Sequence, residues 1–121
     1  MIKYSKANER KQSCPFIGTI NVISRKWFLL VLNVIGNEEK IGFNGILNTI
    51  DGISPKALSD VLKLMEGMEL IKKSLINSSP PRVEYSLTNK GRKLRKSITP
   101  LLKWAADYTG HHDCPILRTK Q

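Results

Sequence analysis

The sequence has few of the residues that catalytic and metal centres require. Its 121 residues include only two cysteines and two histidines, too few for a disulfide-stapled scaffold. His111 and His112 are adjacent, so their side chains diverge, and neither CxxC nor HExxH spacing accompanies them. A glycine-rich phosphate loop and a nucleophile elbow are absent as well. We therefore expect a protein that is not an enzyme and that binds no metal ion or cofactor.

Long apolar segments are also missing. No run reaches the roughly 18 apolar residues of a membrane span, and the polar, lysine-rich N-terminus lacks the apolar centre of a signal peptide. The two cysteines are then reduced by default, so the expected location is cytoplasmic.

The length suits one domain. We place it at residues 14–110, between a basic N-terminal arm at 1–13 and a polar tail at 111–121.

Acidic residues are scarce relative to basic ones. Ten Asp and Glu stand against 20 Lys and Arg, which gives a formal net charge of +10. Ten of the basic residues and only four acidic ones lie between residues 53 and 96. Such an excess attracts a polyanion, although many small proteins carry lysines for solubility alone. We favour a nucleic acid as the partner.

A capped amphipathic helix is the clearest local pattern. Ser54 can cap its free amide groups, Pro55 suits its first position, and Gly67 ends it. Large apolar side chains recur at helical spacing on one face: Leu58, Val61, Leu62 and Met65. The other face is short and polar: Lys56, Ser59, Asp60, Lys63 and Glu66. A helix of this kind packs by one face and offers the other to a partner.

The segments around this helix complete a known arrangement. Strands are predicted at 70–76 and 82–87, joined by a turn rich in Asn, Ser and Pro. Gly36 and Asn37 should stop an apolar, buried core helix. Helices are expected in three earlier segments: 16–23, 27–35 and 44–50. A tight glycine-containing turn joins the last of these to the capped helix, which predicts a helix-turn-helix, and the hairpin makes it winged.

A last helix is predicted from residue 89 to about 108, with Thr88 as its cap. Pro100 removes a hydrogen bond and should kink or split this helix near Ile98. The apolar stripe is broader than a small winged domain covers, so part of it is an expected dimer surface. Packing onto its own domain is the alternative. We assign five residues to the dimer surface: Leu101, Leu102, Trp104, Ala105 and Tyr108.

These elements predict an α+β fold: a winged helix-turn-helix with a two-stranded β-hairpin wing and added terminal helices for dimerisation.

Six short motifs follow one another: Cys14-Pro15, Arg25-Lys-Trp27, Phe43-Asn44, Ile53-Ser-Pro-Lys56, Pro80-Pro-Arg-Val-Glu-Tyr-Ser-Leu-Thr88 and Gly91. In this order they resemble the HxlR-type branch of the MarR-like winged-helix transcription regulators, over about three-quarters of the chain. The resemblance implies a homodimeric, cytoplasmic regulator that binds operator DNA through helix and wing.

The DNA contacts are expected from the polar helix face and the hairpin. The helix start offers unpaired amides and the positive end of the helix dipole, and lysine and serine can contact phosphate or base edges. Arg82 follows two prolines at the hairpin tip and can enter the minor groove, although pairing with Glu84 is an alternative. The helix residues that we assign to DNA binding are Ser54, Pro55, Lys56, Ser59 and Lys63.

We therefore expect a homodimer that binds double-stranded operator DNA of palindromic sequence, most simply as a repressor. The alternative is a winged-helix module for protein or RNA contacts. An exposed apolar patch on the capped helix would favour a protein partner, whereas stacking aromatic side chains would favour RNA.

Cys14 has two interpretations. It can fill a gap at a helix start as a small apolar residue. Alternatively, Lys11, Arg25 and Lys26 lie close in sequence and can stabilise its thiolate, which is typical of an oxidant sensor. A small-molecule or redox effector is compatible with the sequence.

Overall fold

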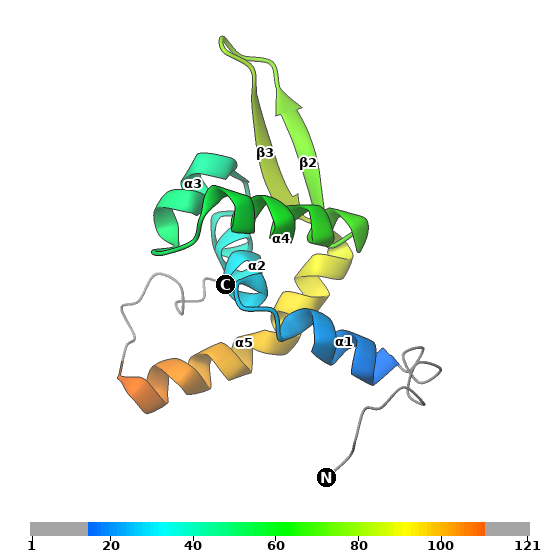
Figure 1. The fold of residues 1–121 in the computed structure, drawn as a ribbon, viewed down its shortest axis with the longest axis vertical. Coiled ribbons are helices and arrows are strands. Elements are labelled where there is room, and N and C mark those ends of the chain that lie inside the picture. The colour runs from blue at the N-terminus through cyan, green and yellow to red at the C-terminus, as the bar shows by residue number, and fades with distance from the viewer. Residues whose placement is uncertain (1–14, 111–121) are drawn as a thin grey trace.

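The computed structural model, which describes residues 15–110, combines a body of helices with a small antiparallel sheet whose hairpin extends out of that body (Figure 1). The elements in chain order are α1 (Pro15–Ile23), α2 (Phe28–Glu38), β1 (Ile41–Gly42), α3 (Phe43–Thr49), α4 (Pro55–Gly67), β2 (Ile71–Ile76), β3 (Arg82–Leu87) and α5 (Asn89–Thr109). The predicted arm at 1–13, Cys14 and the predicted tail at 111–121 lie outside the described residues. The α+β winged helix-turn-helix architecture is confirmed.

Helix α2 forms the centre of the core, as its apolar sequence predicts. Its side chains from Val31 to Ile35 are buried, including the polar Asn33. The predicted stop at Gly36-Asn37 is wrong, because α2 continues to Glu38. Gly36 is tolerated inside the helix for a packing reason. A Cβ atom there would lie 2.1 Å from Cδ of Arg95, so the arginine stem of α5 fills the space.

The sheet has three strands where the sequence predicted two. Its order is β1-β3-β2, and both pairings are antiparallel. The short β1 was expected only as an extended link, but Ile41 pairs with Tyr85 and Gly42 with Glu84. Strand β1 thereby ties the chain just before α3 to the base of the hairpin. The hairpin itself projects from one end of the molecule (Figure 1).

The helix-turn-helix forms as predicted. Gly52 turns the chain between α3 and α4 with a φ of 87°, a conformation that glycine adopts without strain. The Oγ atom of Ser54 accepts a hydrogen bond from the amide of Ala57 at 3.0 Å, and Pro55 begins α4. Four apolar residues of α4 are buried in the core: Leu58, Val61, Leu62 and Met65.

Helix α5 begins with the predicted cap and is not split by Pro100. Thr88 accepts a hydrogen bond from the amide of Gly91 at 3.1 Å, and the helix continues to Thr109. Figure 1 shows its axis changing direction between the yellow and orange halves, and its second half extends away from the helical body. Within residues 15–110, no helix is both long and apolar enough to cross a membrane.

Candidate nucleic-acid interface

The polar face of α4 is open to solvent. Ser54, Pro55, Lys56 and Lys63 are exposed and Ser59 is partly buried, so these five predicted residues share the uncovered side of one helix. The structure brings them together because the buried stripe of the same helix faces the core. None of the strongly exposed large apolar residues in the described part of the chain lies on α4. This face can therefore meet a polar partner, and it offers no apolar patch to a protein.

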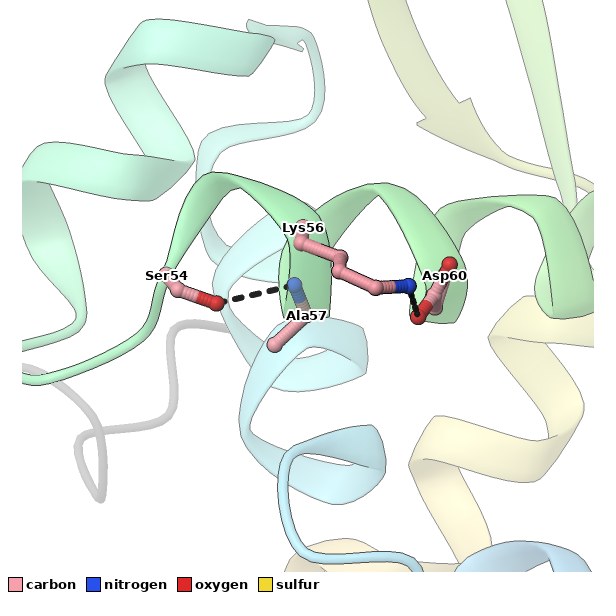
Figure 2. Close-up of polar contacts among 4 residues, drawn as sticks. All are labelled: Ser54, Lys56, Ala57 and Asp60. Carbon is pink, nitrogen blue, oxygen red and sulfur yellow. Dashed lines mark hydrogen bonds and ion pairs between the residues drawn. The ribbon is translucent and has the colours of Figure 1, made fainter.

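Lys56 is oriented by a neighbour that the sequence analysis did not assign to the site. Its Nζ atom lies 3.2 Å from Oδ2 of Asp60, one turn along α4 (Figure 2). The two side chains are 85% and 62% exposed, so the pair contributes only about 0.3–0.5 kcal/mol. A phosphate or a base edge can displace the carboxylate at little cost. The i, i+4 spacing of Lys56 and Asp60 was a usable sequence signal for this contact.

The start of α4 favours a negatively charged group. The Ser54 side chain caps the helix, and the first turn carries no acidic residue. The positive end of the helix dipole is therefore not neutralised by the helix itself. Lys56 adds a full positive charge within the same turn. Phosphate binding at such a helix start is a common use of this geometry.

The wing presents Arg82 at its outer end. Arg82 pairs with Ile76 in the last register position before the turn. Its Nη2 atom lies 3.7 Å from Oε2 of Glu84, so the pairing with Glu84 that was the alternative interpretation is present in the free protein. The Arg82 side chain is nevertheless 68% exposed. An exposed pair of this length is weak and leaves Arg82 able to turn toward DNA.

Exposed apolar side chains gather on the second half of α5. Leu101, Trp104 and Tyr108 are 52%, 60% and 78% exposed. The two aromatic rings stack in parallel with centroids 5.0 Å apart. Leu102 is only 5% exposed and belongs to the core, so its assignment to the exposed dimer surface was wrong. Its neighbour Ala105 is partly buried.

The difference between Leu102 and its neighbours follows from helical spacing. Ile98, Leu102 and Ala106 recur every four residues and face the core. Leu101 and Trp104 lie on an adjacent strip of the same helix, which the domain leaves uncovered. The sequence showed one broad stripe and did not indicate which part of it the domain would cover.

No metal centre occurs in the described region. Residues 15–110 contain no group of three or more His, Cys, Asp or Glu side chains placed to hold an ion. Cys14 and the histidines at 111 and 112 lie outside this region, and their roles stay predictions.

Known proteins are similar to this chain in sequence and in fold. A profile described as HxlR-like helix-turn-helix matches residues 22–113. The uncharacterized HTH-type transcriptional regulator YdzF of Bacillus subtilis is 32% identical over 103 residues, which cover 85% of this chain and 94% of YdzF. These matches include every element that builds the interface.

Solved structures agree with the sequence matches. A protein of Porphyromonas gingivalis W83 assigned to the MarR family of transcriptional regulators is 35% identical, with a TM-score of 0.68 over 83% of this chain and 93% of that one. The regulator YodB of B. subtilis, in its reduced form, is 28% identical, with a TM-score of 0.68 over 78% and 93% of the two chains. A diamide-treated form of YodB matches as well. The chain therefore belongs to the HxlR-like helix-turn-helix family, and it is a DNA-binding transcriptional regulator, not an enzyme.

Proposed function

We propose that this regulator binds a palindromic operator as a homodimer and represses transcription from it. The observation that carries the proposal is the exposed polar face of α4, flanked by a wing that ends in Arg82. In this docking mode α4 lies in the major groove and its lysine and serine side chains contact base edges. Arg82 reaches the minor groove beside it.

The second half of α5 supports the dimer. Trp104 and Tyr108 stack on each other and are exposed, as is Leu101. Exposure of large apolar side chains to water is unfavourable, and such a patch is typical of an interaction surface. A two-fold interface would bury these side chains and hold two α4 helices about one turn of DNA apart, at roughly 34 Å. A palindromic operator then mirrors the symmetry of the protein.

A winged-helix module for protein or RNA contacts is a weaker alternative. The exposed face of α4 lacks the large apolar side chains that a protein partner would need, and it carries no aromatic ring on which an RNA base could stack.

Substitutions in α4 should change sequence preference. Lys56→Ala or Ser59→Ala should cost about 1–3 kcal/mol on the preferred operator, and less on sequences altered at the base that each residue contacts. Arg82→Ala should weaken binding mainly where A·T-rich flanks narrow the minor groove. Fluorescence anisotropy with a panel of operator variants measures both effects. If all three variants lost affinity equally on every sequence, base readout by α4 would be disproved.

Substitutions in α5 should weaken the dimer. Leu101→Ala or Trp104→Ala removes an apolar side chain worth on the order of 2–5 kcal/mol when fully buried, so the monomer fraction in sedimentation should rise. Leu75→Ala is the matched control, because Leu75 is 68% exposed but lies on the wing. It should leave the mass unchanged. A monomeric wild-type protein at micromolar concentration would contradict the dimer proposal.

We also propose a redox role for Cys14, which rests on its basic sequence neighbours and on the existence of reduced and diamide-treated forms of the related YodB. Diamide treatment should lower the operator affinity of the wild-type protein, because a disulfide or adduct at a helix start displaces that helix. The Cys14→Ser protein should keep its affinity under the same treatment. If the wild-type and Cys14→Ser proteins bound the operator equally well with and without diamide, the redox role would be wrong and Cys14 would be a packing residue.

A further inference from the structure

A second basic feature lies apart from α4 and the wing tip. A cavity of about 530 Å³ opens between the end of α2, the base of the hairpin and the first half of α5. Its volume falls within the range of small-molecule sites in proteins. Five of the side chains that line it are basic: Lys40, Lys72, Arg92, Arg95 and Lys96. Glu39 is the single acidic residue among the lining residues.

The basic side chains converge because separate elements supply them. Arg92, Arg95 and Lys96 occupy positions i, i+3 and i+4 of α5, so they share a face. Lys72 comes from β2. Lys40 is placed by a tight turn in which its amide donates to the carbonyl of Glu38 at 2.6 Å. Glu39, at the centre of that turn, has φ 64° and ψ −48°, a strained γ-turn conformation that non-glycine residues rarely adopt.

Most of these charges are not held in an ion pair in the described part of the chain. Within residues 15–110, none of Lys40, Lys72, Arg92 and Lys96 forms an ion pair with a carboxylate. Convergent like charges raise the local positive potential and concentrate anions. An anion bearing more than one charge would relieve their mutual repulsion.

Hydrogen bonds hold Arg95 in place in the cavity, and part of the lining is apolar. Nε of Arg95 donates to Oδ1 of Asn33 at 3.2 Å, and Nη2 of Arg95 donates to Asn37. The arginine stem lies against Gly36, and burial lowers the pKa of Arg95 below its usual range. Three apolar residues contribute to the walls: Ile35, Leu87 and Pro100. This lining suits a ligand with an organic body and a charged end.

Two residues of the cavity lining, Lys72 and Ser86, lie on the face of the sheet opposite to Tyr85. Lys73 pairs with Tyr85 and Lys72 with Ser86, and directly paired residues point to the same face of a sheet. Tyr85 is buried in the core, and the nearby charge of Glu66 on α4 adds to burial in raising its pKa. Lys72 and Ser86 therefore point to the opposite face. No residue of α4 is among the residues that line the cavity, so the cavity is separate from the polar face of that helix.

We propose that this cavity binds a small organic phosphate, such as a phosphate monoester with an apolar body. Lysine ammonium groups and the Arg92 guanidinium would hold the phosphate, because both suit its charge and oxygen geometry. The apolar walls would hold the organic part. A bound ligand would touch the base of the wing and Pro100 of α5 together. Any resulting change in operator affinity rests on the proposed function, whereas binding of the ligand does not.

Calorimetric titration with phenyl phosphate at constant ionic strength tests the proposal. We expect saturable binding of one molecule per protomer, and weaker binding of inorganic phosphate, which lacks the organic body. Lys72→Gln and Lys96→Gln should each weaken binding about tenfold, as expected for loss of a charged hydrogen bond. Lys73→Gln and Lys93→Gln remove the same charge from the same elements without lining the cavity, and they should change binding less than twofold.

A second measurement locates the ligand. Amide NMR shifts on addition of phenyl phosphate should concentrate at Gly36, Ser86 and Thr99 and leave Ser59 on α4 unchanged. Equal weakening in all four variants would overturn the site, because the attraction would then be diffuse. If inorganic phosphate bound as tightly as phenyl phosphate, the proposal that the apolar walls hold an organic group would be wrong. Binding of phenyl phosphate that does not saturate would overturn the proposal. If Lys72→Gln and Lys96→Gln then weakened duplex binding instead, these cations would be assigned to contacts with the DNA backbone.

Discussion

Operator affinity should fall by roughly 10³–10⁵ between 50 and 200 mM salt, if the dimer makes about 6–10 phosphate contacts. The physical reason is counterion release. Each lysine or arginine that neutralises a phosphate frees a condensed cation, and added salt opposes that release. The chain carries enough basic residues for that number of phosphate contacts, because its net charge is +10 and ten Lys and Arg lie between positions 53 and 96. Anisotropy titrations on a selected operator duplex measure the slope of log K against log salt.

A pair of variants separates specific phosphate contacts from overall charge. Lys63→Ala should reduce the salt slope by about 2 per dimer, because Lys63 lies exposed on α4 and a contact would occur in each half-site. Lys103→Ala is the control. It removes the same charge from the second half of α5, which extends away from α4 and the wing (Figure 1), and it should leave the salt slope unchanged. A flat salt titration of the wild-type protein would be incompatible with operator binding through α4 and the wing.

The second large effect is on stability. Gly91→Ala should lower the free energy of unfolding by about 3 kcal/mol, near the upper end of what overpacking usually costs. A Cβ atom at position 91 would lie 2.1 Å from the carbonyl oxygen of Leu70. That oxygen also accepts a hydrogen bond from the amide of Thr88 at 2.9 Å. The backbone of α5 and the strand start would have to separate, and the hairpin would lose its anchor.

Thermal unfolding followed by circular dichroism measures the loss, which should lower the melting temperature by roughly 10–20 °C. Gly67→Ala is the matched control at the end of α4. A Cβ atom at position 67 would meet nothing within 4 Å, so alanine there should be neutral or should stabilise by up to about 1 kcal/mol. If the two alanine variants melted together, the close approach at Gly91 would not contribute to stability.

Local patterns predicted much of the structure on which the candidate interface is built. The start of α4 was predictable because the Ser54 cap, Pro55 and the spacing of Leu58 to Met65 all act within one or two turns. The hairpin and the Thr88 cap of α5 depend on short-range signals of the same kind. The exposed positions of Lys56 and Lys63 then followed from the buried stripe on the other face of the helix.

The sequence by itself therefore determined the order of the main elements, the winged helix-turn-helix and the exposed polar face of α4, since neighbouring residues form those structures. Only the tertiary structure decided that β1 joins the sheet, that α2 passes Gly36 and that Leu102 is buried beside exposed Trp104. It also brought Lys40, Lys72 and α5 to one cavity. These outcomes depend on contacts between segments tens of residues apart, where no local spacing records which surfaces will meet.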